Sequence, residues 1–120
     1  SGAERFEEGG YLRMMELLNQ DNPPTAVFAS YDSMALGAMQ AARERDLEIP
    51  KDISIVGYDN VRESAYFPAP LTTVAPPVIE MGELAVDLLT RKIEKKDKKL
   101  VQHVSLKPKL IIRKSSSPVK

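Results

Sequence analysis

The fold follows from residues 25–59, which read TAVFASYDSMALGAMQAARERDLEIPKDISIVGYD. Two short apolar runs, at 25–30 and 53–57, have the length and composition of buried strands. The segment between them repeats apolar residues at the spacing of one helical face, namely Ala35, Ala38, Met39 and Ala42. A strand, a helix and a second strand form a βαβ unit, so we expect two parallel, neighbouring strands in an α/β fold.

The remaining elements extend this unit in both directions. Residues 4–20 have the pattern of an amphipathic helix, with apolar positions at Phe6, Met14, Leu17 and Leu18. After the second strand we expect an irregular connection over 60–70, an extended segment at 71–74 and a helix over 76–96 that opens on two prolines.

Two further extended pieces are predicted near the C-terminus, at 101–106 and 110–113. The tail from Ser115 is expected to be frayed. In the central helix, Gly37 and the neighbouring alanines are small, so we expect that helix to pack closely on the sheet.

The composition excludes several classes of protein. The chain has no cysteine, which excludes disulfides and thiolate metal sites. No apolar stretch is long enough to span a membrane, and no signal peptide is visible at the N-terminus. We find neither a glycine-rich phosphate loop nor a metal-ligand cluster, so no cofactor and no metal are expected.

Charge is distributed unevenly, although the net charge is zero. Residues 1–63 carry 12 acidic and 6 basic side chains, whereas residues 64–120 carry 5 acidic and 11 basic ones. Much of the basic excess lies in residues 91–99, a run without aromatic residues at the predicted end of a helix. Because cations interact favourably with a helix C-terminus, we interpret this run as a solvated helix end and not as a nucleic-acid interface.

Each strand of the βαβ unit leads into an aspartate. Asp32 follows the first strand after Tyr31, and Asp59 follows the second after Tyr58. Ligands of open parallel sheets bind beyond the carboxyl ends of the strands, so both carboxylates are predicted to face the same crevice. An ionised aspartate accepts hydrogen bonds from hydroxyl-rich or cationic ligands, and each tyrosine offers an apolar ring face with one polar group.

These residues also have structural interpretations. Asp32 is well placed to cap the following helix, and Asp59 begins a loop in which aspartate commonly bonds its own backbone. Tyr31 and Tyr58 also fit rim or core positions. Gly57 is expected to permit a close backbone approach or an unusual φ.

Two aspartates also suggest glycoside hydrolysis, but that chemistry needs one carboxyl group kept protonated in an apolar pocket, which the sequence does not indicate. The only histidine, His103, lies in an alternating predicted strand without a serine or aspartate partner nearby. We therefore expect no enzymatic activity and no catalytic residue.

Taken together, these segments resemble the LacI/GalR family of bacterial repressors. The resemblance covers nearly the whole chain, and its motifs are PTAVF at 24–28, DSMALGAM at 32–39, IPKDISIVGYDN at 49–60, PLTTV at 70–74, MGELA at 81–85 and LIIRKSS at 110–116.

The resemblance implies a parallel sheet flanked by helices, as part of a periplasmic-binding-protein-like (type I) fold and mainly its C-terminal lobe. Residues 1–75 are assigned to that lobe, and residues 76–106 to a helix and strand that would complete the N-terminal lobe. Residues 107–114 are a strand that returns to the C-terminal lobe, and residues 115–120 are a tail. The family's helix-turn-helix domain has no counterpart in this chain.

Under this division, the helix over 76–96 belongs to a lobe whose other parts are absent. Its apolar face then lacks a partner and comprises Val78, Met81, Ala85, Leu88, Leu89 and Ile93. Because exposure of such a face is unfavourable, we expect the helix to fold back on its own lobe, to stay mobile or, as we favour, to pair with another copy.

The resemblance also implies functional residues. The family's effector-contacting aspartate falls on Asp59, and a second contact falls on Tyr31, beside Asp32. Other members often have a small or amide residue at the position of Tyr31, and a polar residue at the position of Pro76. These two departures leave the ligand class and the hinge between the lobes open.

The implied function is the ligand-sensing part of a cytoplasmic repressor, which binds a sugar or other small metabolite and allosterically controls operator DNA through the separate helix-turn-helix domain. Such repressors act as homodimers, and here the interface is predicted to involve Leu36 and Phe67. The alternative is a periplasmic sugar-binding protein of a transport system, although those proteins generally lack the PLTTV and LIIR segments. Neither alternative places the chain in a membrane.

Overall fold

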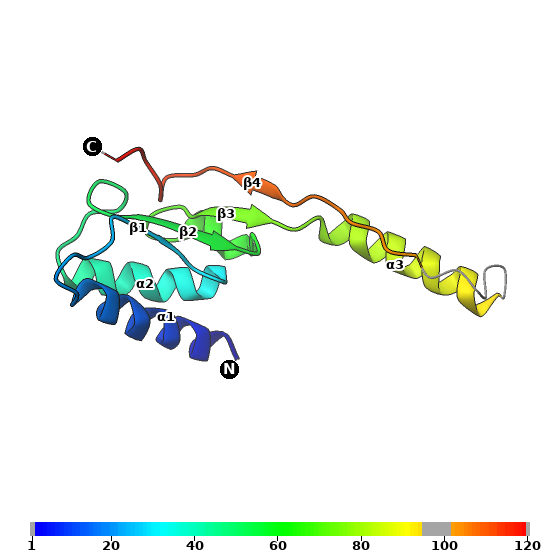
Figure 1. Ribbon diagram of the computed structural model, residues 1–120, viewed down its shortest axis with the longest axis horizontal. Coiled ribbons are helices and arrows are strands. Elements are labelled where there is room, and N and C mark those ends of the chain that lie inside the picture. Colours follow the sequence, from blue (N-terminus) through cyan, green and yellow to red (C-terminus); the bar gives the residue numbers. More distant parts are fainter. Residues whose placement is uncertain (1, 95–101, 120) are drawn as a thin grey trace. The chain divides into compact units, whose positions relative to one another are not determined.

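The computed structural model of the protein describes residues 2–94 and 102–119. The chain divides into two compact units, one of Ser1–Ala75 with Leu110–Lys120 and the other of Pro76–Lys109. In chain order the elements are α1 (Gly2–Leu18), β1 (Ala26–Phe28), α2 (Asp32–Glu44), β2 (Ser54–Tyr58), the 3-10 helix η1 (Arg62–Tyr66), β3 (Thr72–Ala75), α3 (Val78–Ile93) and β4 (Lys109–Ile111) (Figure 1).

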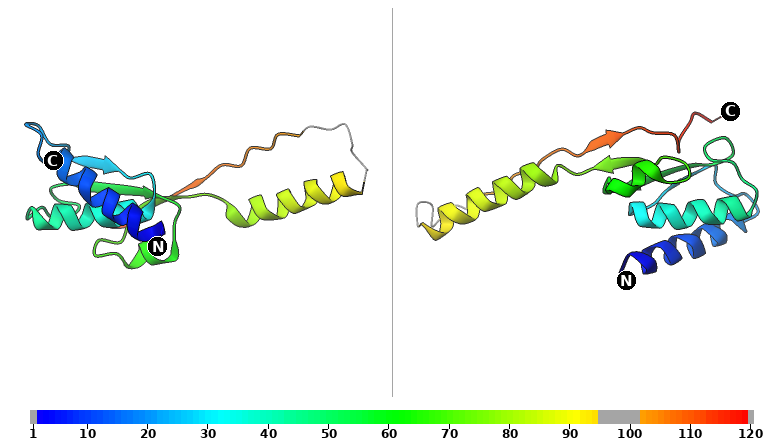
Figure 2. Two further views of the ribbon diagram at one scale, coloured as in Figure 1. Left: turned by 90° about the horizontal axis from the view of Figure 1, so that it is seen from below. Right: turned by 180° about the vertical axis from the view of Figure 1, so that it is seen from behind.

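The sheet has the order β1-β2-β3-β4. Strand β2 pairs in parallel with β1 on one side and with β3 on the other. The predicted parallel βαβ unit is therefore confirmed, and so is the α/β fold class. Helices α1 and α2 lie side by side on one face of the sheet (Figures 1 and 2).

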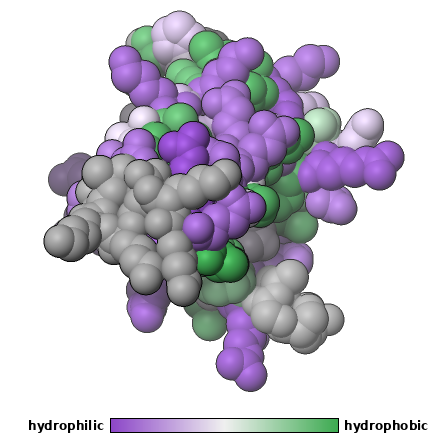
Figure 3. Space-filling model, turned by 90° about the vertical axis from the view of Figure 1, so that its right-hand side faces the viewer, coloured by the Kyte–Doolittle hydropathy of each residue, from purple (hydrophilic) through white to green (hydrophobic). Residues whose placement is uncertain are grey.

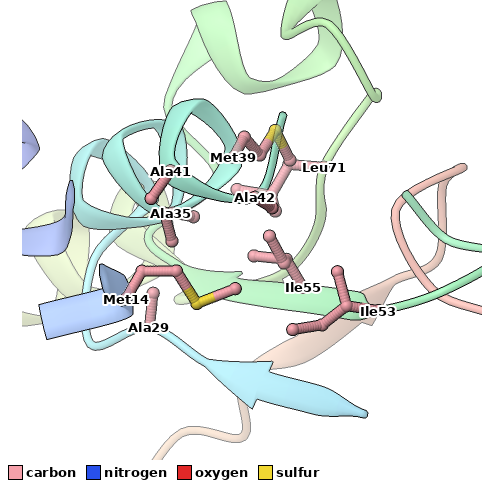
Figure 4. Close-up of a cluster of buried hydrophobic side chains, with 10 residues drawn as sticks. Met14, Ala29, Ala35, Met39, Ala41, Ala42, Ile53, Ile55 and Leu71 are labelled. Atoms are coloured by element: carbon pink, nitrogen blue, oxygen red, sulfur yellow. The ribbon is translucent and has the colours of Figure 1, made fainter. Parts of the chain in front are cut away.

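The hydrophobic core lies between β2 and the two helices. Ile53 and Ile55 extend from the β2 segment toward α2, and Met14 reaches the same cluster from α1 (Figure 4). The buried residues of the cluster are Met14, Ala29, Ala35, Ala38, Met39, Ala41, Ala42, Ile53, Ile55 and Leu71. Because α2 contributes mainly alanines, its axis can approach the sheet closely, and the few large side chains fill the space that remains.

The contact between α1 and α2 depends on two glycines. A Cβ atom at Gly37 would overlap the backbone carbonyl of Glu7, and one at Gly10 would overlap the backbone carbonyl of Met34. The expectation that Gly37 serves packing on the sheet is therefore wrong, because its open side faces α1. The hydroxyl of Tyr11 on α1 also donates a hydrogen bond of 2.6 Å to Glu44 on α2, which raises the pKa of Tyr11.

The C-terminal tail is bonded to the sheet, and the expectation that it frays is wrong for residues 115–117. Ser115 is completely buried, its hydroxyl donates to the carbonyl of Ile55 and its carbonyl accepts from the amide of Ile55. Ser117 donates its amide to the hydroxyl of Ser54 at 3.1 Å. The tail thus satisfies polar groups of β2 that the sheet itself leaves free.

The second unit contains α3, which ends at Ile93 with Arg91 and Lys92 in its last turn, as the dipole favours. Two predicted features extend outside the described residues, namely the helix at 95 and 96 and the basic run at 95–99.

The strand predicted over 101–106 is not present in the described part of that range. Residues 102–106 form no strand, so the prediction is wrong for them, and residue 101 lies outside the described residues.

No residue of α3 is buried. Hydrophobic residues reach the surface on the face that Figure 3 shows, and the exposed apolar side chains of α3 are Val78, Ile79, Met81, Val86, Leu89 and Ile93. The predicted pairing with another copy concerns the face formed by Val78, Met81, Ala85, Leu88, Leu89 and Ile93, and it stays a prediction.

Candidate ligand-binding site

The register of the parallel strands brings Tyr31 and Asp59 to the same edge of the sheet. Phe28 of β1 is opposite Val56 of β2, so Tyr31 and Asp59 each lie three residues beyond a matched pair. The backbone amide of Asp59 also donates to the carbonyl of Val74 on β3, at 2.9 Å. Both side chains are exposed beyond the carboxyl ends of neighbouring strands, where open α/β sheets bind ligands.

The backbone of Asp59 and Asn60 has a conformation that non-glycine residues seldom adopt, with φ values of 123° and 55°. Such conformations cost on the order of 1–3 kcal/mol and persist only where the surroundings determine them. Here three consecutive amides are hydrogen-bonded. Besides that of Asp59, the amide of Asn60 donates to Thr73 Oγ1 at 3.4 Å and that of Val61 to Asp32 Oδ2 at 2.8 Å.

Asp32 is completely buried and supports this loop. Its Oδ2 accepts from Val61, and its Oδ1 accepts from the hydroxyl of Thr73, which is also buried. The expectation that Asp32 caps α2 is wrong, because the N-cap residue is Tyr31 and no side chain caps the helix. Direct contact of Asp32 with a ligand stays a prediction.

Gly57 permits the burial of Asp32. A Cβ atom at Gly57 would overlap Asp32 Oδ1 and would lie 2.8 Å from a methyl carbon of Leu71. The φ angle of Gly57 is not positive, so the glycine serves a close approach and not an unusual conformation.

Arg113 approaches the same loop from the C-terminal segment. Its Nη2 donates to Asn60 Oδ1 at 2.8 Å, and its Nη1 donates to Ser64 Oγ at 3.0 Å and to the carbonyl of Leu71 at 2.8 Å. Its backbone amide donates to Thr72 Oγ1 at 3.0 Å. The sequence pattern does not predict the roles of three residues of this site, Arg113, Asn60 and Thr73, because their partners are far away in the chain. The only signal in the sequence is a lone arginine after the apolar run 110–112.

The two tyrosines differ in their surroundings. Tyr31 is 43% exposed, and its ring is tilted against that of Phe6 with centroids 5.0 Å apart. Phe6 itself is 46% exposed, so it is not a core residue of α1 as its periodicity suggested. Tyr58 is half-buried, and His103 is exposed in the second unit. Tyr31 thus offers an aromatic face that Phe6 holds in place.

The two residues predicted for a dimer interface, Leu36 and Phe67, are both half-buried. Phe67 also packs against the core cluster, so part of its ring has a structural role. Their place in an interface stays a prediction.

Two other features are absent from residues 2–94 and 102–119, the part of the chain that the structure describes. Within them no three histidine, cysteine, aspartate or glutamate side chains are grouped so that they could hold a metal ion. In the same part of the chain no helix is both long enough and apolar enough to cross a membrane.

Comparison with known proteins gives the class to which this arrangement belongs. Residues 1–116 match the family model of a periplasmic binding protein-like domain. The chain therefore belongs to that family, and the partial periplasmic-binding-protein-like fold is confirmed. Within it, the chain is part of an effector-binding domain of the LacI/GalR type, as its relatives indicate.

Curated relatives of the chain include transcriptional repressors. The chain is 41% identical over 113 residues to the HTH-type transcriptional repressor PurR of Glaesserella parasuis, and 44% identical over 108 residues to PurR of Klebsiella pneumoniae. These matches cover 90% of this chain but 33% and 31% of the relatives. The chain thus spans about a third of the length of the curated relatives that it matches.

Solved structures of LacI-type regulators are also similar to this chain. A LacI family transcriptional regulator from Enterococcus faecalis V583 with bound ribose is 37% identical, with a TM-score of 0.85 over 95% of this chain and 42% of that one. The lac repressor dimer bound to operator and the anti-inducer ONPF is 34% identical, with a TM-score of 0.82 over 91% of this chain and 37% of that one.

Proposed function

We propose that this chain is the ligand-sensing part of a bacterial transcriptional repressor of the cytoplasm. It binds a sugar or other small metabolite and allosterically controls operator binding by a separate helix-turn-helix domain. One observation carries the proposal: Tyr31 and Asp59 share one edge of the sheet, with the backbone at Asp59 held by three consecutive hydrogen-bonded amides. The repressor relatives and the ribose-bound neighbours support it.

The chemistry of these side chains suits a small hydroxylated ligand. The carboxylate of Asp59 accepts hydrogen bonds from hydroxyl groups, and Tyr31 packs its apolar face on a sugar ring. Asp32 supports the Asp59 loop through the hydrogen bonds that its two oxygens accept from Val61 and Thr73. Binding, and not catalysis, is the proposed role.

Substitution of Asp59 tests the ligand contact. In the full-length protein, Asp59→Ala is expected to weaken binding by about 2 kcal/mol, or about thirtyfold in Kd, because a charged acceptor is lost. A thermal-shift screen of sugars, nucleosides and amino acids, starting with ribose, identifies a ligand through the rise in Tm, and calorimetry then gives Kd.

The exposed Asp21, which lies between α1 and β1, provides the control. Asp21→Ala is expected to leave Kd unchanged. An Asp59→Ala protein that binds the identified ligand as tightly as the wild type would rule out the assignment.

A periplasmic sugar-binding protein of a transport system is the second candidate, because it shares the domain family. The two candidates differ in whether they bind operator DNA and whether the ligand changes that binding. A repressor is expected to change its operator affinity when the ligand is added, since ligand-driven closure of the lobes alters the spacing of the paired DNA-binding domains. Electrophoretic mobility shifts of full-length protein with and without ligand separate the two functions.

The proposed repressor is a homodimer, because two half-sites need two DNA-binding domains related by a two-fold axis. We expect Leu36→Asp and Phe67→Asp to disrupt the dimer, since each would bury an unpaired charge at the interface. Sedimentation at micromolar concentration measures this, with a circular dichroism spectrum to verify folding. Variants that fold and remain dimeric would remove these residues from the interface.

A further inference from the structure

Arg113 lies apart from the predicted ligand contacts, yet its guanidinium reaches the loop that carries one of them. We propose that Arg113 is a positioning residue for ligand binding, which holds the backbone of Asp59 and Asn60 in its binding conformation. This inference rests on the function proposed above and deepens it.

The guanidinium bonds to three points along the connection between β2 and β3. Asn60 Oδ1 lies at its start, Ser64 Oγ in η1, and the Leu71 carbonyl just before β3. A planar guanidinium can donate to three separate oxygens at once, whereas an ammonium group lacks that fixed geometry. Arg113 thereby closes residues 60–71 into a compact loop.

Two features argue for a role in positioning beyond ordinary packing. The partners of the guanidinium are uncharged oxygens, and no carboxylate among the described residues forms a salt bridge with it. In addition, Asn60 is adjacent to Asp59, and both have a positive φ that their surroundings must maintain. The bond from Arg113 to Asn60 is therefore made at the place where the backbone is strained.

The position of Arg113 in the chain adds a second connection. Residues 76–109 form the second unit, so β3 leads into it and β4 leads out of it. The Asp59 loop is bonded to β3 through Thr73 and Val74, and to the segment after β4 through Arg113. The loop is thus bonded to β3, through which the chain enters the second unit, and to the segment that follows β4, through which the chain leaves it.

The test combines hydrogen exchange with ligand affinity in the full-length protein. Arg113→Met removes the donors and retains most of the apolar stem. Asn60→Gly removes the side-chain acceptor and still permits a positive φ. The control is Arg62→Met, because Arg62 is exposed and has no side-chain hydrogen bond among the described residues.

In the ligand-free protein, Arg113→Met is expected to raise amide exchange in residues 59–61 by about tenfold, with a change below about twofold in β2. Ribose affinity, measured by calorimetry, is expected to fall about tenfold. Because both substitutions break the same bond, the Arg113→Met/Asn60→Gly double variant is expected to bind ribose no more weakly than the weaker-binding of the two single variants. Arg113→Lys is expected to resemble Arg113→Met in both measurements, because an ammonium group lacks the planar geometry of the guanidinium.

Equal increases in exchange across the whole first unit would show a general structural role and overturn the proposal. So would unchanged exchange at 59–61, or strictly additive losses in the double variant. If the wild-type protein does not bind ribose, ribose alone is excluded as its ligand, and the exchange data still decide the role of Arg113.

Discussion

Replacement of Gly37 by alanine is expected to lower the free energy of unfolding by about 3 kcal/mol, the upper part of the range for overpacking. The added methyl group would overlap the backbone carbonyl of Glu7, and backbone atoms cannot move aside as a flexible side chain can. The two helices would have to separate, which would loosen the contacts around Met14. Gly10→Ala is expected to have a similar effect from the other helix.

Gly9 provides a matched control in the same helix. A Cβ atom there has no neighbour within 4 Å, so Gly9→Ala is expected to raise stability by about 0.5–1 kcal/mol through helix propensity. Urea unfolding of the full-length variants measures all three effects. A Gly10→Ala protein as stable as the Gly9→Ala protein would show that α1 and α2 do not pack in this way.

The second large effect is expected at Asp32. Asp32→Ala removes a charged acceptor from the amide of Val61 and from the buried hydroxyl of Thr73. Hydrogen bonds to charged groups contribute about 1.5–3 kcal/mol each, so we expect a loss of about 3 kcal/mol or more in the free energy of unfolding. Urea unfolding of the full-length protein measures the loss.

Asp32→Asn separates the loss of charge from the loss of shape. Its amide oxygen can accept from only one of the two donors while its NH₂ group faces the other, so an intermediate loss of stability is expected. The exposed Asp21→Ala variant again serves as the control. An Asp32→Ala protein with wild-type stability would show that the hydrogen bonds from Val61 and Thr73 to this carboxylate do not stabilise the fold.

The candidate site was predictable in part. The sequence pattern placed Tyr31 and Asp59 after neighbouring parallel strands, and the register of β1 and β2 confirms that arrangement. It also placed Asp32 beside them, but the role of that side chain differs from the helix cap that was expected. A cap is a local feature of residue type, whereas the bond to Thr73 crosses 41 residues of chain.

The secondary-structure predictions failed where local pattern and long-range contact disagree. Residues 102–106 alternate like a strand and form none. Ser115 begins a serine-rich segment whose composition is typical of a frayed tail, yet its hydroxyl donates a hydrogen bond to the carbonyl of Ile55, 60 residues away. Hydrogen bonding to a sheet edge depends on which backbone groups the fold leaves unpaired, and no local property of a serine reveals this.

The sequence by itself determined the βαβ unit, the parallel pairing of its strands, the α/β class and the family, because periodicity and turn chemistry are local and the motifs occur in a fixed order. Only the tertiary structure decided that Gly37 faces α1, that Asp32 is buried against Gly57, and that Arg113 holds the loop after Asp59. The physical reason is that these roles depend on backbone and side-chain oxygens that folding brings together from distant parts of the chain.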